Sequence, residues 1–241
     1  MRRLAILFVS LLLGGVLASC APAPFNLCGW SAPSGVHTTV RLTGDLQCTQ
    51  GFTVDGTGTA LTLDLGGHTY EVLGASPFSS KDNGHTDISN GWIRSDGHAA
   101  WIGQPPGWGT LNFDGVVMVN SGFWFQYGNV TIQESSFVNS PVSFQHASTT
   151  VNGSSFSGSR ITNTWSDLTL FGTDVSGVVD DIAIQHYDGR VDVHSGSSIH
   201  SNKVGIHVRQ GVAEVHPGAS MLNNRTDCTT EPGWAAYTYG C

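Results

Sequence analysis

The sequence predicts an all-β protein folded as a single right-handed parallel β-helix. Three observations predict this fold: a repeat of about twenty residues, a small residue at one position of each repeat, and no apolar pattern at a helical period. Only 12% of the 241 residues are charged and 31 are glycine. The 39% hydrophobic content and the recurring β-branched runs indicate a packed β core and not a disordered chain.

Short alternating segments define the repeat. The segment IQESSF (132–137) recurs nineteen residues later as VNGSSF (151–156). The apolar residues that begin successive copies are spaced by 23, 25, 19, 19, 19, 23 and 22 residues, and they are Leu65, Ile88, Phe113, Ile132, Val151, Leu170, Val193 and Val215. This period is too short for a propeller blade, and the pattern of leucine-rich repeats is absent. We therefore expect about eight coils stacked about 4.8 Å apart and wound right-handed, as parallel crossovers are.

One bend of each coil carries asparagine or glycine, the residues that best tolerate a positive φ. The column consists of Asn120, Asn139, Gly158, Gly177, Asn202, and Asn223 or Asn224. It predicts a left-handed corner that recurs in each coil.

A family resemblance follows from these patterns. An apolar anchor, an Asn corner and a Gly-led strand, as in IHSNKVGIHV (199–208), resemble the parallel β-helix repeats of the pectate-lyase-like superfamily. The segments LTGDLQC (42–48) and LTLDLGGH (61–68) are similar to the opening coils of its secreted members. The resemblance covers roughly residues 36 to 225. It implies the fold but no single activity, because the superfamily includes lyases, hydrolases, epimerases, adhesins and spacers.

The first residues are typical of an export signal. Arg2 and Arg3 precede an apolar run that is too short for a comfortable membrane span. The run ends in Leu-Ala-Ser-Cys20, which looks like the lipobox at which bacterial lipoproteins are cleaved and lipidated; an ordinary signal peptide cut nearby is the alternative. We expect a signal peptide over 1–19, a lipidated tether and cap over 20–35, the β-helix over 36–225, and a disulfide-closed cap over 226–241. The protein would then be exported and lipid-anchored to the bacterial cell envelope.

Five cysteines are an odd number for an exported protein, and a lipidated Cys20 would leave four. The simplest of the three connectivities pairs Cys28 with Cys48 and Cys228 with Cys241, one pair near each end. Trp234, Tyr237 and Tyr239 lie inside the second loop and are expected to cover the last coil.

The net charge of the chain restricts its partners. It is −8, and removing the two positive charges of Arg2 and Arg3 makes it −10. Nucleic acid and anionic membrane surfaces are therefore poor partners, and membrane contact is expected only through the lipid.

The second strand of each coil supplies outward columns of polar and aromatic side chains. The first column is Trp124, Ser143, Thr162, Ala183 and His207; the second is Gln126, Gln145, Thr164, Gln185 and Arg209; the third, at the strand end, is Tyr127, His146, Trp165, His186 and Gln210. Aromatic rings that stack on pyranose faces and amides that bond hydroxyls are typical of sugar-binding surfaces. A solvated face with Gln ladders is the alternative.

Two further groups could carry chemistry. Asp192 is expected to lie over Glu214 and His194 over His216, and these four side chains could hold a divalent metal; a protonated histidine would compensate the carboxylates equally well. Asp180 and Asp181 resemble the paired aspartates of polygalacturonase-type hydrolases, with His207 and Arg209 downstream. The Gly-His-Gly and Arg-Ile-Lys motifs of that family are missing, and a polar turn is the alternative reading of the pair.

The sequence thus favours an envelope β-helix lipoprotein that binds polysaccharide or another envelope glycan, or acts as a surface scaffold or adhesion module, without a cofactor. The alternative is a carbohydrate-active enzyme, a glycoside hydrolase before a polysaccharide lyase. A calcium-binding carboxylate cluster with a nearby Arg or Lys base, as a lyase needs, is not evident.

Overall fold

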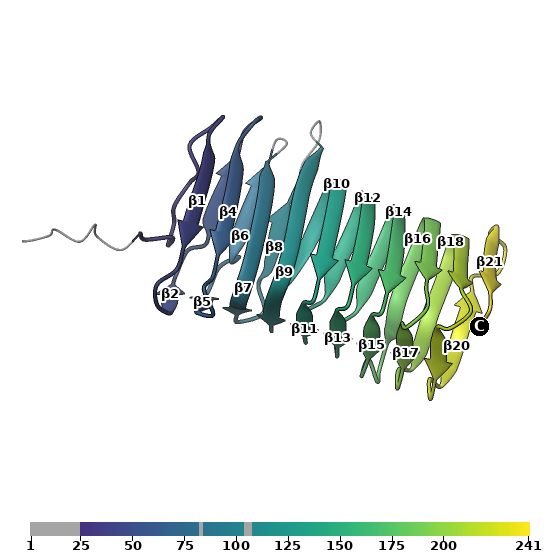
Figure 1. Cartoon of the computed structure of the whole chain (residues 1–241). Coiled ribbons are helices and arrows are strands. Elements are labelled where there is room, and N and C mark those ends of the chain that lie inside the picture. The colour runs from purple at the N-terminus through teal and green to yellow at the C-terminus, as the bar shows by residue number, and fades with distance from the viewer. Residues whose placement is uncertain (1–24, 82–83, 104–107) are drawn as a thin grey trace, which may run out of the picture.

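The computed structural model describes residues 25–81, 84–103 and 108–241. In these residues the chain forms an all-β parallel solenoid of about nine turns (Figure 1). The predicted signal peptide over 1–19 and Cys20 lie outside the described residues. Among the residues described, no helix has the length and apolar character needed to span a membrane.

Three parallel ladders form the walls of the solenoid, and the long strands bend at a corner to pass from one ladder to the next (Figure 1). Ladder 1 contains β3 (Phe52–Asp55), β6 (Phe78–Lys81), β8 (Ala99–Ile102), the first halves of β10 (Gly122–Gln133), β12 (Val142–Asn152), β14 (Ile161–Phe171), β16 (Ile182–Val193) and β18 (Val204–Val215), and β20 (Thr226–Thr230). Ladder 2 contains β1 (His37–Arg41), β4 (Ala60–Asp64), the first halves of β7 (His85–Ser95) and β9 (Gly109–Val119), the second halves of β10, β12, β14, β16 and β18, and β21 (Ala236–Tyr239). Ladder 3 contains β2 (Leu46–Cys48), β5 (Thr69–Val72), the second halves of β7 and β9, β11 (Ser136–Val138), β13 (Ser155–Ser157), β15 (Asp174–Ser176), β17 (Ser198–His200) and β19 (Ser220–Leu222).

The predicted repeat is confirmed by the strand register. Ile132 pairs with Val151 and Val151 with Leu170, and all three are buried. The first anchor is wrong by two residues, because Leu63 and not Leu65 pairs with Ile88. Val40 pairs with Leu63 one turn earlier, so one turn precedes the first predicted anchor, within the predicted bounds of 36–225.

The predicted left-handed corner is also confirmed, with one shift. Asn120, Asn139 and Asn223 have φ values of 49°, 49° and 55°, and Gly158 and Gly177 share this conformation. In the turn between Gly177 and Asn223 the left-handed residue is Ser201, with φ of 58°, and not Asn202. The Asn202 side chain instead lies inside the corner, where its Nδ2 donates to Val175 O at 3.1 Å.

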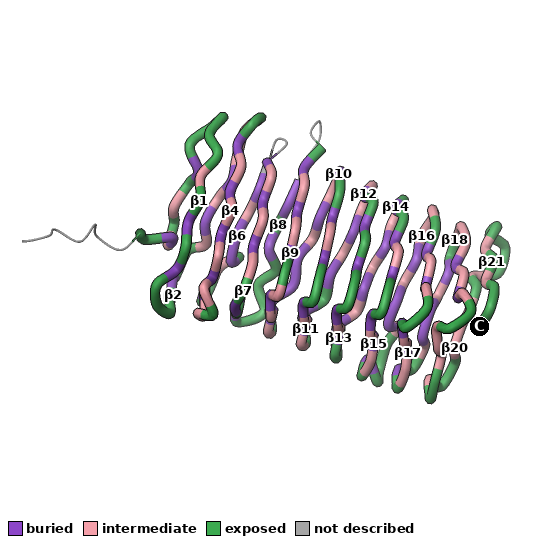
Figure 2. The backbone as a smooth tube through the Cα atoms, in the orientation of Figure 1, coloured by how far each residue is buried: buried purple, intermediate pink, exposed green. Residues whose placement is uncertain are grey.

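Aromatic and aliphatic side chains fill the interior of the solenoid, which Figure 2 shows as alternating buried and less buried positions along each strand. Phe137 stacks on Phe156 with ring centroids 4.7 Å apart, and it also contacts Phe113 and Phe123. Buried hydroxyls near two corners bind the backbone of the preceding turn: Ser140 N donates to Ser159 Oγ at 2.8 Å. The core is therefore a continuous apolar column, with the buried hydroxyls at these corners hydrogen-bonded to backbone.

Each end of the solenoid carries one predicted disulfide, and both pairings are confirmed: Cys28 with Cys48, and Cys228 with Cys241. The region expected as a C-terminal cap also continues the ladders, since β20 and β21 both pair with β18. Trp234, Tyr237 and Tyr239 do not cover the last coil as expected. They are 52%, 54% and 55% exposed. β21 aligns Tyr237 with Val212 and Tyr239 with Glu214 on the outer side of ladder 2, which accounts for the two tyrosines.

Candidate functional site

Three rings stack at the corner between ladders 1 and 2. The ring centroids of Tyr127 and His146 are 4.7 Å apart, and those of His146 and Trp165 are 5.1 Å apart, with nearly parallel planes. All three residues adopt a left-handed backbone, with φ of 64°, 51° and 49°. Bulky residues rarely occupy this region, which favours Gly and Asn. Strained backbone conformations cluster at functional sites, so these three side chains are candidates for ligand contacts.

Trp165 ends this stack, is 54% exposed, and lies between two grooves. The first groove, about 440 Å³, is lined by Thr164, Trp165, Tyr187, Arg209, Gln210 and Trp234. The guanidinium carbon of Arg209 lies 5.6 Å from the centre of the Tyr187 ring and 5.2 Å from that of Trp234, so the cation holds the two aromatic walls together. The second groove, about 330 Å³, contains Trp108, His146, Trp165 and Asp167. Trp108 is 70% exposed beside it.

We call the set Trp108, Tyr127, His146, Trp165, Tyr187, Arg209 and Trp234 the aromatic corner. It combines exposed ring faces with amide and guanidinium donors along several turns. Flat apolar faces beside hydrogen-bonding groups match the alternating C–H and O–H faces of a sugar ring.

The predicted outward columns hold as far as β14. Trp124 pairs with Ser143 and Ser143 with Thr162, while Gln126 pairs with Gln145 and Gln145 with Thr164. The Gln126 amide donates to the Gln145 amide oxygen at 3.1 Å, as in the alternative of a Gln ladder. Trp124 also contacts Trp101 of the preceding turn, with centroids 4.2 Å apart.

The columns are wrong in β16 by two residues, whereas His207 of β18 keeps its predicted place in the first column. Thr162 pairs with Gln185 and Thr164 with Tyr187, because the extra residues before β16 shift the register. Gln185 therefore belongs to the first column, where it pairs with His207. Ala183, expected outward, is buried. A register irregularity follows in β18, where Tyr187 pairs with Gln210 and Arg209 projects into the first groove.

His186 is the clearest correction, since it was expected on the surface and is fully buried. It pairs with the buried Asn163, whose Nδ2 lies 3.1 Å from His186 Nδ1. The same Nδ2 donates to Ser166 O at 2.7 Å, so Nδ1 accepts and the proton of the neutral ring lies on Nε2. Within the described residues, His186 Nε2 and Asn163 Oδ1 have no hydrogen-bond partner.

Acidification should therefore destabilise the fold through His186. Burial lowers the pKa of His186, and the Gly189 carbonyl and the Asp188 and Asp167 charges only partly oppose it. Below pH of about 6.5 the unfolded chain then binds a proton that the folded chain resists, so stability falls as pH falls. Urea unfolding at pH 7.5 and 5.5 measures this loss. His186→Gln should reduce this loss; an equal loss in the wild type and the variant would contradict the assignment.

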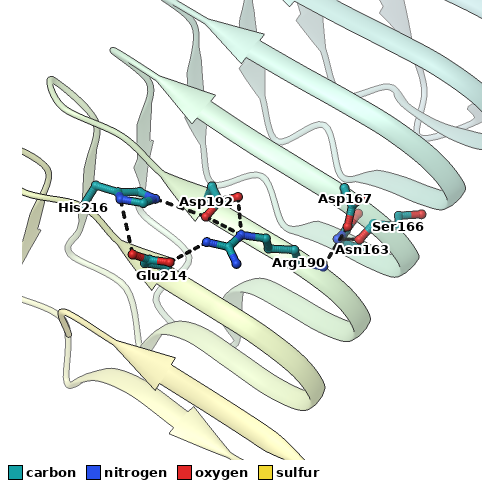
Figure 3. A network of polar contacts seen from close by, with 7 residues as sticks. All are labelled: Asn163, Ser166, Asp167, Arg190, Asp192, Glu214 and His216. Carbon is teal, nitrogen blue, oxygen red and sulfur yellow. Dashed lines mark hydrogen bonds and ion pairs between the residues drawn. The ribbon is translucent and has the colours of Figure 1, made fainter.

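The predicted metal ligands come together, but a guanidinium lies among them (Figure 3). Ligand atoms of Asp192, Glu214 and His216 lie within 4.8 Å of one another. Arg190 Nε donates to both Asp192 oxygens, at 2.9 and 2.7 Å, and Arg190 Nη2 contacts Glu214. His216 Nε2 lies 3.1 Å from Asp192 and its Nδ1 3.5 Å from Glu214. His194 is outside this set and stacks between Phe171 and His216, at 4.4 and 4.3 Å.

Arg190 bonds both carboxylates of this cluster, so a positive charge already lies between them. Burial raises the pKa of Asp192, but hydrogen bonds from Arg190 and His216 outweigh it and hold that pKa below its usual value. A divalent ion at this position would need to displace the guanidinium, so the geometry favours an ion-pair cluster.

The predicted catalytic residues Asp180, Asp181 and His207 each contact different partners and not one another. Asp181 Oδ2 is 2.9 Å from Arg160, and its Oδ1 accepts from Ile182 N at 2.8 Å. Asp180 is exposed, and its backbone carbonyl accepts from Lys203 Nζ at 3.2 Å. His207 contacts Thr229 Oγ1 at 2.8 Å and Glu231 at 3.3 Å. These contacts match the alternative of a polar turn.

Sequence reasoning missed Tyr187, Arg190 and Trp108 as parts of these sites. Arg190 lies two residues before Asp192 on the same strand, a spacing that places both on one face and could have identified it. Comparisons of this chain with protein-family models, with curated proteins and with solved structures found no match.

Proposed function

We propose that this chain is an exported lipoprotein of the bacterial cell envelope, anchored through Cys20, whose β-helix binds polysaccharide at the aromatic corner. The observation that carries the proposal is the position of Trp165. Its ring lines both grooves and ends a stack of rings whose residues have a strained, left-handed backbone. We also propose that the fold is of the pectate-lyase-like kind. Binding is favoured over hydrolysis because Asp181 is bound to Arg160 and caps Ile182 N.

The proposed ligand surface is the pair of grooves at the aromatic corner and not a flat sheet face. The two grooves lie along the corner, and Trp108 and Trp234 lie at their outer ends on either side of Trp165. A linear glycan that follows the corner would meet a ring in each groove, with Gln210 and Arg209 as donors to its hydroxyls. The net charge of −8 remains unfavourable for nucleic acid.

Trp165→Asn tests the platform while keeping the backbone conformation, because Asn tolerates positive φ. Affinity electrophoresis in gels containing soluble β-glucan, xylan, chitosan or polygalacturonate should show retardation of the wild type by at least one polymer. The variant should bind that polymer about fivefold or more weakly, since a lost ring stack costs about 1 kcal/mol. Trp92→Asn, which removes a ring 38% exposed on ladder 3, is the matched control. Equal weakening by both variants would remove the assignment to the corner.

The anchor is tested separately. Cys20→Ser should release the protein from the membrane fraction of cells or leave it unprocessed, because no thioether can then form at the lipobox. Fractionation and mass measurement of the N-terminus report both effects. Unchanged partitioning and processing would contradict lipidation and favour an ordinary signal peptide.

A further inference from the structure

A third groove, which differs in chemistry from the two at the aromatic corner, lies at the corner between ladders 3 and 1. It measures about 410 Å³ and is lined by Val179, Ser201, Asn202, Lys203, Asn223, Asn224 and Arg225. We call it the basic pocket. The basic pocket contains two of the ten Lys and Arg residues of the chain, whose net charge is −8.

The two cations lie on successive turns of the solenoid. Thr226 N donates to Lys203 O at 3.1 Å, and Arg225 N donates to Asn202 O at 2.9 Å, which places Arg225 next to Lys203 across the turn. Like charges at neighbouring positions of a ladder are unfavourable unless something compensates them.

Compensation by carboxylates is absent here in the part of the chain that the structure describes. Arg41, Arg160 and Arg190 each have a carboxylate within 4.0 Å, but Lys203 and Arg225 have none. Lys203 Nζ donates to a backbone carbonyl, that of Asp180. Both side chains are exposed, so their remaining N–H groups face the groove and solvent.

The amide oxygens of Asn202 and Asn224 are turned inward and already satisfied. Asn202 Oδ1 accepts from Val178 N at 2.9 Å, and Asn224 Oδ1 accepts from Asn202 N and Nδ2 at 3.1 and 3.0 Å. The positively charged donors left for a ligand are therefore the Lys203 ammonium and the Arg225 guanidinium, both exposed at the groove. A donor-rich groove with two positive charges fits a tetrahedral oxyanion, which can accept from both cations at once.

We propose that the basic pocket binds a phosphate or sulfate group through Lys203 and Arg225, independently of the aromatic corner. The group comes from a free ion or from a substituent of an envelope glycan. The site would neutralise the stacked charges, and phosphate should stabilise the folded protein by mass action.

Titration of the mature protein with sodium phosphate and sodium sulfate at constant ionic strength, followed by ¹⁵N NMR, tests the site. Saturable shifts should appear at the amides of 201–203 and 223–225. Lys203→Gln and Arg225→Gln should each weaken binding about tenfold, because each removes a charge-assisted contact. Arg94→Gln, which removes an exposed charge on β7 in ladder 3, should leave binding unchanged.

A second arm uses glucose 6-phosphate against inorganic phosphate. Tighter binding of the sugar ester assigns the pocket to a glycan substituent, and equal binding assigns it to the free ion; both support the oxyanion site. Shifts that do not saturate, or equal weakening by all three variants, would overturn it. Thermal unfolding of each variant verifies that the exposed substitutions leave the fold intact.

Discussion

Phe137→Ala should lower the free energy of unfolding by about 3 to 5 kcal/mol, the range for truncating a fully buried phenylalanine. The Phe137 ring is completely buried and stacks on Phe156 at 4.7 Å. Phe113 and Phe123 contact it from the preceding turn and from ladder 1. Strands fixed by ladder hydrogen bonds on both sides cannot close the cavity, so most of its cost should remain.

Phe171→Ala is the matched control for this prediction. Phe171 is 39% exposed and stacks on His194 at 4.4 Å. Its loss should cost about 1 kcal/mol. Denaturant unfolding of both variants measures the contrast, and similar losses would mean that the interior is not packed as described.

Gly128→Ala should destabilise the fold by about 2 to 6 kcal/mol, through overpacking and backbone strain together. Gly128 has φ of 138°, and a Cβ at this position would lie 2.0 Å from Gly109 O. That neighbour is backbone within ladder 2, which cannot move without breaking the register. Ala147 occupies the equivalent position one turn later and accepts a Cβ there. Gly189 and Gly211 return to glycine in later turns, where a Cβ would lie 2.4 Å from the carbonyl of the preceding turn.

Gly97→Ala is the control that separates the cost of backbone strain from the cost of steric overlap at the new Cβ. Gly97 has φ of 101° but no atom within 4 Å of a built Cβ. It should cost only the backbone strain, about 1 to 3 kcal/mol. Thermal unfolding that ranks Gly97→Ala as the more damaging change would contradict the tight passage at Gly128.

The sequence predicted the fold because the same apolar position recurs in each turn. Ile132, Val151 and Leu170 carry a period of nineteen that only stacked coils can bury together. The prediction of outward columns failed where the period changed. Residues inserted before β16 moved Gln185 to the position expected of Ala183, and a two-residue change keeps the alternation of faces, so the pattern alone gave no warning.

His186 shows a second limit of sequence patterns. Because histidine is polar, a histidine in a strand is predicted to point outward. In this structure, however, Asn163 on the preceding turn supplies a buried partner for His186. The two residues are 23 apart in sequence, and their pairing follows only from the register of β14 and β16. The buried serine ladder near Ser140 was missed for the same reason, because each hydroxyl binds the backbone of another turn.

The most direct test of polysaccharide binding is a glycan array probed with the mature wild-type protein, with a parallel assay for newly released reducing ends. The aromatic corner predicts a set of related linear glycans that are bound and recovered uncut. Asp181→Asn should bind the same glycans, because its carboxylate contacts Arg160 and the backbone of Ile182. Release of sugar ends that Asp181→Asn abolishes would replace the binding role with hydrolysis, and a wild type that binds no glycan would contradict the proposed function outright.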